Sequence, residues 1–236
     1  MSRKETLLVN EIFFSIQGES SYAGRPCAFV RLTACNLRCR YCDTEYAFYE
    51  GKPMAIEAVM DQVLRYPTEL VEITGGEPLL QAAVHTLVAR LLDAGKEVLI
   101  ETGGSLDIAP VDPRAVLVYD IKCPDSGMAE KNRWENLARL RDHDEVKFVI
   151  SSRADYEWAK RILSERGIPS RHIVLFSPAW RELDPAQLAE SHIHGNDALG
   201  AIFQKTVREP PRGGPHVQDH FSANFYGKMI ERSLQF

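Results

Sequence analysis

Short apolar runs rich in β-branched residues alternate with amphipathic segments along most of this chain. About six such runs, with helical segments between them, restrict the fold to an α/β architecture built on a parallel sheet. A sheet of that class is either open and doubly wound or an incomplete (β/α) barrel. We expect the strands at residues 27–34, 70–75, 97–101, 115–121, 145–150 and 172–176.

Two of the intervening segments have the periodicity of amphipathic helices. One helix face consists of Ile56, Val59, Val63 and Leu64, and a second, which ends near Gly95, consists of Leu80, Val84, Leu87, Val88 and Leu91. Residues 154–166 and 185–190 continue the alternation more weakly. In both candidate folds chemistry takes place at the carboxyl ends of the strands, and we expect the site there.

Composition limits the class of protein further. The 236 residues are 44% hydrophobic and 26% charged, with a net charge near −5. These values fit one globular domain of ordinary size and give no basic surface for a nucleic acid. No apolar run is long enough to span a membrane. We therefore expect a cytoplasmic protein that binds neither nucleic acids nor membranes.

Three of the five cysteines lie close together, as Cys35-x3-Cys39-x2-Cys42. Clustered cysteines in a reducing compartment bind metal more often than they form disulfides. Three thiolates can hold three irons of an iron–sulfur cubane and leave the fourth iron open. A zinc site completed by a distant residue and ordinary buried cysteines are the alternatives. Cys27 and Cys123 are left out of the cluster.

The cysteine motif, with Tyr41 before its last cysteine, resembles the signature of radical S-adenosylmethionine (SAM) enzymes. The segment Thr74-Gly75-Gly76-Glu77-Pro78 is similar to the GGEP motif of the same superfamily. This resemblance implies a modified, incomplete (β/α) TIM-like barrel of about six parallel strands, the radical SAM core. It also implies a 4Fe-4S cluster whose open iron binds SAM, and a reduction that cleaves SAM to a 5′-deoxyadenosyl radical.

Further segments narrow the family. Residues 14–20 (Phe-Ser-Ile-Gln-Gly-Glu-Ser), 24–26 (Gly-Arg-Pro) and 29–32 (Phe-Val-Arg-Leu) precede the cysteines, and Asp43-Thr44 follows them. This ordered set resembles the 7-carboxy-7-deazaguanine synthases. The resemblance implies a lyase that converts 6-carboxy-5,6,7,8-tetrahydropterin to 7-carboxy-7-deazaguanine with loss of ammonia, in the biosynthesis of 7-deazapurines such as queuosine. Magnesium is then a third cofactor.

The same resemblance implies roles for individual residues. The cluster ligands are Cys35, Cys39 and Cys42, and the magnesium ligand is Thr44. The implied SAM contacts are Tyr41, Cys42, Asp43, Gly76, Asp120, Ile121, Lys122 and Ser177. The implied substrate contacts are Ile16, Gln17, Gly18, Glu19, Arg31 and Thr74. No protein acid or base is implied, because the radical carries the chemistry.

These residue types suit their roles, and each also has a simpler interpretation. Arg31 offers a rigid fork for a carboxylate, Thr44 offers a hard oxygen for magnesium, and Gly76 lets SAM approach the backbone. Alternatively, Glu19 and Arg31 form a surface ion pair, Thr44 is a helix N-cap, and the glycines form a turn. Lys122 is then a solvated side chain.

The end of the chain departs from the family pattern. We expect residues 1–190 to form the catalytic domain and residues 191–236 to form an irregular C-terminal tail. This tail lacks the Leu-Gln-x-His-Lys-like segment that is usual in the family.

Two other functions remain open. A glycyl-radical activating enzyme shares the cysteine motif and a GGEP-type loop, but usually has a Gly-Pro-Gly segment ahead of the cysteines that this chain lacks. A non-enzymatic iron–sulfur or zinc protein would have no use for the GGEP loop. For the synthase, the resemblance implies a small-molecule substrate, an external electron donor of the flavodoxin or ferredoxin type, and a homodimer.

Overall fold

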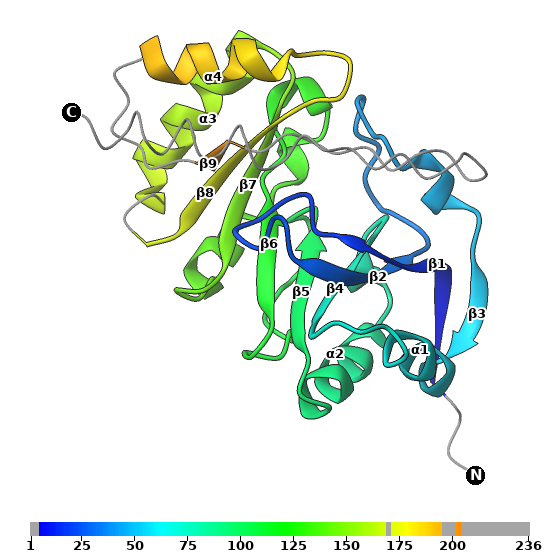
Figure 1. The fold of residues 1–236 in the computed structure, drawn as a ribbon. Coiled ribbons are helices and arrows are strands. Elements are labelled where there is room, and N and C mark those ends of the chain that lie inside the picture. Colours follow the sequence, from blue (N-terminus) through cyan, green and yellow to red (C-terminus); the bar gives the residue numbers. More distant parts are fainter. Residues whose placement is uncertain (1–4, 169–170, 195–201, 204–236) are drawn as a thin grey trace. The chain divides into compact units, whose positions relative to one another are not determined.

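The six expected strands are confirmed. The computed structural model describes residues 5–168, 171–194 and 202–203, all within the unit Met1–Thr206. The expected strands are β2 (Pro26–Leu32), β4 (Leu70–Gly75), β5 (Glu97–Thr102), β6 (Val116–Asp120), β7 (Glu145–Ile150) and β8 (Ile173–Pro178). They pair in parallel in this order and form the centre of an open sheet (Figure 1). The fold is therefore the expected incomplete barrel.

Three further strands were not expected from the sequence. They are β1 (Thr6–Ile16), β3 (Lys52–Ala55) and β9 (Ile202–Phe203), which complete the sheet order β3-β1-β2-β4-β5-β6-β7-β8-β9 among the described residues. β1 pairs antiparallel with both β2 and β3, and its register with β2 shifts between Val9 and Glu11. This irregularity interrupts the two-residue apolar alternation by which such a strand is recognised.

Four α-helices accompany the described strands. They are α1 (Ile56–Val63), α2 (Val84–Asp93), α3 (Arg153–Arg166) and α4 (Pro185–His194), and the short 3-10 helices are η1 (Glu45–Phe48), η2 (Pro78–Leu80), η3 (Pro124–Ser126), η4 (Ala129–Lys131) and η5 (Trp134–Arg139). Leu80 was expected on the face of α2, but it lies in η2 and is exposed. None of these described helices has the length and apolar character needed to cross a membrane.

The predicted change of character at residue 191 falls within α4. Residues 195–201 and 204–236 lie outside the described residues. The predicted tail and its boundary therefore stay predictions.

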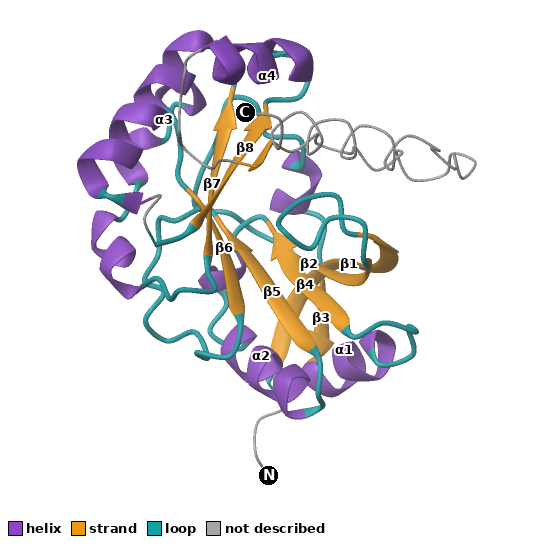
Figure 2. Ribbon diagram, turned by 60° about the vertical axis from the view of Figure 1, so that its left-hand side comes forward, coloured by secondary structure: helices purple, strands orange, loops and turns teal. Residues whose placement is uncertain are grey.

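The two faces of the sheet differ in chemistry. One face packs against the helices, which lie along its outer side (Figure 2), and its core residues include Val30, Ile73, Ile100, Tyr119, Phe148 and Phe176. Since neighbouring residues of a strand point to opposite faces, the residues between them form an inner face. Toward the amino ends of β2 and β4, this inner face has a small apolar cluster of Cys27, Phe29, Leu70 and Leu99. The rest of the inner face carries most of the buried charged and polar side chains, with Val118 and Leu175 among them.

Candidate active site

Charged side chains line the inner face of the sheet although little water reaches them. Strand register places Arg31 beside Thr74, and Asp120 beside Lys147. Glu72 and Lys147 are 6% and 5% exposed. Burying a charge is costly unless it is paired, so the partners of these groups define what the surface can do.

Lys147 is the centre of the largest of these networks. Its ammonium donates to Glu101 Oε1 at 2.7 Å and to the carboxylate of Glu19, while Thr74 Oγ1 donates to Glu101 Oε2 at 3.0 Å. Burial alone would raise the pKa of Glu101, but Lys147 outweighs it and lowers this pKa to about 2. Two predicted substrate contacts, Glu19 and Thr74, thus belong to one hydrogen-bond network around Lys147.

A second buried carboxyl holds the segment that contains Glu19. The side-chain amide of Gln17 donates to Glu72, and Gln17 Oε1 accepts from the backbone N–H of Glu19 at 3.0 Å. Burial, with repulsion from Glu101, raises the pKa of Glu72 to about 8. Glu72 is therefore mostly a neutral acid at neutral pH.

Arg31 forms its ion pair with Glu11 and not with Glu19, the partner considered in the sequence analysis. Its Nε donates to Glu11 Oε1 at 2.9 Å, and its guanidinium lies over the rings of Phe13 and Tyr46. Since Glu19 pairs with Lys147, the proposed Glu19–Arg31 surface pair is wrong. Arg31 is buried at the carboxyl end of β2.

The predicted contacts at Ile16 and Gly18 stay predictions. Ile16 ends β1 and is 66% exposed.

The cysteine loop follows β2 and packs directly on the GGEP segment. A Cβ on Gly76 would lie 2.1 Å from the carbonyl oxygen of Ala34 and 3.0 Å from the Cβ of Cys35. Gly75 has a φ of +138°, and a Cβ there would meet the backbone of Leu32 at 2.1 Å. Both glycines are needed because backbone meets backbone at this point. Gly76 adjoins the cysteine loop, and its predicted contact with SAM is untested.

Glu77 fastens the same segment to the end of β5. Its fully buried carboxylate accepts hydrogen bonds from Leu79 N at 3.0 Å, Gly103 N at 2.8 Å and Thr102 Oγ1 at 3.0 Å. Burial raises its pKa, and these donors oppose that shift. The carboxylate thus fixes the GGEP segment relative to the end of β5.

The three clustered cysteines are free and half-buried. Burial raises the pKa of the Cys39 thiol to about 11, while Lys122 opposes the shift. Among the described residues, no three His, Cys, Asp or Glu side chains converge to hold a single metal ion. A cubane binds each thiolate to a different iron, whereas a zinc ion needs its ligands around one centre.

Thr44 lies beside the last cysteine of the motif. It occupies the N-cap position of η1, but its side chain makes no capping hydrogen bond. Its hydroxyl is 3.8 Å from Cys42 Sγ. Thr44 is therefore the N-cap residue of η1 by position, without a side-chain cap, and its role as a magnesium ligand stays a prediction.

Arg40, within the cysteine motif, ties the loop to the rim of the sheet. Its guanidinium donates to Asp125 O at 2.9 Å and to both oxygens of Glu182 at 3.0 and 3.1 Å. The neighbouring Tyr41 donates to Val149 O at 3.2 Å, at the end of β7. The loop is thus held at three places around the rim.

The Asp120-Ile121-Lys122 segment lies at the carboxyl end of β6, close enough to the cysteine loop for Lys122 to act on Cys39. Lys122 Nζ bonds Asp120 Oδ2 at 2.6 Å, so Lys122 is paired and not a solvated side chain. The side chain of Asn132 accepts from the backbone N–H of Lys122 and donates to its carbonyl, both at 2.9 Å. Ile121 is buried in the core. Asn132 therefore fixes the backbone of this segment.

Two polar atoms in this region are buried without a hydrogen-bond partner in the described part of the chain. They are Asp120 Oδ1 and Ser177 Oγ, on β6 and β8. Buried polar atoms are normally bonded, so unpaired ones at a strand end indicate a place for a polar ligand. With the three thiols nearby on the same rim, the residues present fit a 4Fe-4S cluster together with SAM.

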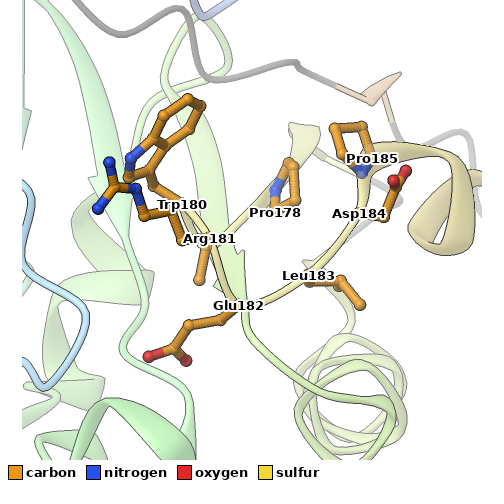
Figure 3. A pocket seen from close by; sticks show the side chains of 8 residues that line it. Pro178, Trp180, Arg181, Glu182, Leu183, Asp184 and Pro185 are labelled. Atoms are coloured by element: carbon orange, nitrogen blue, oxygen red, sulfur yellow. The ribbon is translucent and has the colours of Figure 1, made fainter.

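A cavity of about 350 Å³ lies in the loop after β8, lined by residues 178–185 (Figure 3). The residues that line it follow Ser177 directly in the chain. The side chains of Trp180 and Arg181 lie together at one end of the cavity, and those of Asp184 and Pro185 lie at the other. Glu182 of this loop is the residue that pairs with Arg40.

Several of these site residues are not identified by the sequence analysis. Glu72, Glu101 and Lys147 interrupt otherwise apolar strands, and that interruption was the available signal. Arg40 and Asn132 act through backbone contacts that no local pattern indicates.

The comparisons with known proteins agree with this geometry. The family model described as the radical SAM superfamily matches residues 30–116. A 7-carboxy-7-deazaguanine synthase of Chlorobaculum tepidum is 46% identical over 80% of this chain and 88% of its own length. One of Koribacter versatilis is 50% identical over 74% and 78%. The crystal structure of QueE from Escherichia coli has the same fold, with a TM-score of 0.71 at 21% identity, covering 86% of this chain and 95% of that one.

Identity at this level over most of the chain decides between the functions considered from the sequence. It does not favour a glycyl-radical activating enzyme. The buried polar inner face, the cysteine loop and these relatives lead to one conclusion: the chain belongs to the 7-carboxy-7-deazaguanine synthase family of radical SAM enzymes, lyases of 7-deazapurine biosynthesis.

Proposed function

We propose that the inner face of the sheet binds 6-carboxytetrahydropterin above the Lys147 network. The observation that carries this proposal is that Glu19 and Thr74 share one buried network through Lys147 and Glu101. A pterin edge presents several donors and acceptors, and this hydrogen-bond network offers fixed partners for them. Ile16 and Gly18 would contribute backbone groups, and Gln17 would contribute the second lone pair of its carbonyl oxygen, because its N–H already donates to Arg25 O.

Arg31 would bind the substrate carboxylate. It is held at the end of β2 by Glu11 and two aromatic rings, so its fork is oriented before the substrate arrives. Thr44 would supply a hydroxyl oxygen to magnesium, a cation that accepts such a ligand while keeping positions for substrate and water.

SAM would lie between the cysteine loop and the ends of β6 and β8. Cys35, Cys39 and Cys42 would hold the cluster, and Asp120 and Ser177 would use their unpaired oxygens on SAM. The other proposed contacts are Tyr41, Asp43, Gly76, Ile121 and Lys122. When bound, the cluster and SAM supply the radical that removes hydrogen from C6 of the pterin.

The protein's own residues would orient the bound pterin and SAM and enclose them. Lys147 keeps Glu101 ionised, Glu77 fixes the GGEP segment, and Asn132 fixes the backbone of Lys122. Preorganisation of this kind lowers the cost of aligning two reactants. We also propose an electron donor of the flavodoxin or ferredoxin type, because the cluster must be reduced from outside, and a homodimer, on the family resemblance.

Two conservative variants test whether Thr74 belongs to the pterin-binding part of the site and Ser177 to the SAM-binding part. Thr74→Val keeps the shape of the side chain and removes one hydroxyl, so we expect the KM for the pterin to rise about tenfold, the value of one hydrogen bond. Ser177→Ala should raise the KM for SAM by a similar factor. Steady-state kinetics of the reconstituted enzyme with each ligand varied in turn measures both. Equal effects of each variant on both KM values would contradict the assignment.

A further inference from the structure

Residues 17–21, here called the strap, are the first part of the connection between β1 and β2 and reach across the inner face of the sheet (Figure 1). Alternate residues of the strap bond to buried side chains beneath it. Gln17 bonds to Glu72 of β4, Glu19 to Lys147 of β7, and Ser21 N to the carboxylate of Glu145 at 3.1 Å, also on β7.

The strap therefore spans from β4 to β7, with β5 and β6 between them in the sheet. The first residue of the strap is also fixed through its backbone: Gln17 N donates to Arg25 O and Gly24 N donates to Gln17 O, both at 2.8 Å. Ser20 is held at a φ of +63°, a conformation that non-glycine residues adopt only where their surroundings impose it. The strap is thus a fastened element of the sheet and not a free loop.

Lys147 contacts both the strap and strand β5. It is buried, and the same ammonium bonds Glu19 on the strap and Glu101 on β5, whose second oxygen accepts from Thr74. Without Lys147, two partly buried carboxylates would lie near each other with no cation between them. One side chain therefore sets the position of groups on two separate elements.

We propose that Lys147 is a positioning residue: it holds the strap against the sheet and so sets Glu19 relative to Thr74, at the separation the pterin requires. This inference rests on the proposed function for the identity of the ligand. The fastening itself is independent of it, because the strap contacts do not involve a ligand.

Lys147→Met tests the proposal, since it keeps the length of the side chain and removes the charge. Lys160→Met is the matched control, because Lys160 makes a surface ion pair with Glu157 on α3. The first measurement is amide hydrogen exchange of the strap in the reconstituted enzyme. We expect exchange of residues 17–21 to become at least tenfold faster in Lys147→Met and to stay unchanged in Lys160→Met.

The second measurement is turnover. Lys147→Met should raise the KM for the pterin more than tenfold while iron content and the KM for SAM stay at the parent values, and Lys147→Arg should recover part of the loss. Unchanged strap exchange and an unchanged pterin KM would overturn the proposal. If Lys147→Met does not fold, Glu19→Gln weakens the same link, and unchanged strap exchange in that variant would equally overturn it. A faster-exchanging strap in a protein whose parent form binds no pterin would instead reject the proposed function.

Discussion

Several charged side chains inside the sheet are stabilised by oppositely charged partners. Lys147 is accompanied by two carboxylates, Lys122 by Asp120, and Arg31 by Glu11. Glu72 is held differently, because it accepts a hydrogen bond from the neutral side-chain amide of Gln17. Its burial therefore favours the protonated form, and this has a measurable consequence.

Glu72 should make the stability of the protein depend on pH. Its pKa in the folded protein is about 8, above the ordinary 4.5, so the folded state binds this proton more tightly than the unfolded state. The stabilisation is complete below pH 4.5 and is lost as the pH rises through 8. We expect Glu72→Gln, which needs no proton, to gain stability relative to the parent across this range. Thermal unfolding at pH 5, 6.5 and 8 measures the difference, and a difference that does not grow with pH would contradict this account.

The five cysteines should separate into two groups. Cys39→Ala should lose most of the bound iron after reconstitution, since it removes one of three cluster ligands. Cys27→Ala should keep it, because Cys27 is buried in the small apolar cluster of the inner face. Iron per chain and the visible absorption of the cluster give both results. Equal iron content in the two variants would contradict the assignment of the ligands.

At the scale of elements, the GGEP segment and the cysteine loop behave as one unit. Backbone hydrogen bonds join them, from Gly76 N to Leu32 O at 3.1 Å and from Glu77 N to Ala34 O at 2.8 Å. These bonds continue the parallel pairing of β2 and β4 beyond the ends of the strands. The position of the cluster therefore depends on how closely two loops approach each other.

Gly76→Ala tests this dependence. Its Cβ would meet the carbonyl of Ala34 at 2.1 Å, so the loop before Cys35 must move. We expect a loss of stability of roughly 1–3 kcal/mol and less than half of the parent iron content. Gly95→Ala is the control: its Cβ meets nothing within 4 Å, and at a φ of +80° it should cost about 1 kcal/mol with full iron content. Equal iron content in both variants would contradict a close-approach role for Gly76.

At the scale of the whole molecule, the parallel strands and the position of the site could be predicted, because buried parallel strands are continuous apolar runs and sites gather at their carboxyl ends. The network around Lys147 could not, since it depends on which residues of β4, β5 and β7 share a face. That choice is set by strand register, which one sequence does not specify. β1 was missed because its bulge breaks the alternation. The predicted tail, 191–236, lies largely outside the described residues.

Turnover of the complete chain tests the central claim most directly. The cluster is reconstituted anaerobically, and reductant, SAM, magnesium and 6-carboxytetrahydropterin are added before the products are analysed by mass spectrometry. The account predicts 7-carboxy-7-deazaguanine, formed only when the pterin and SAM are both present. Accumulation of 5′-deoxyadenosine with the pterin left unchanged would contradict it, because the radical would then form beside a pocket that does not hold this substrate.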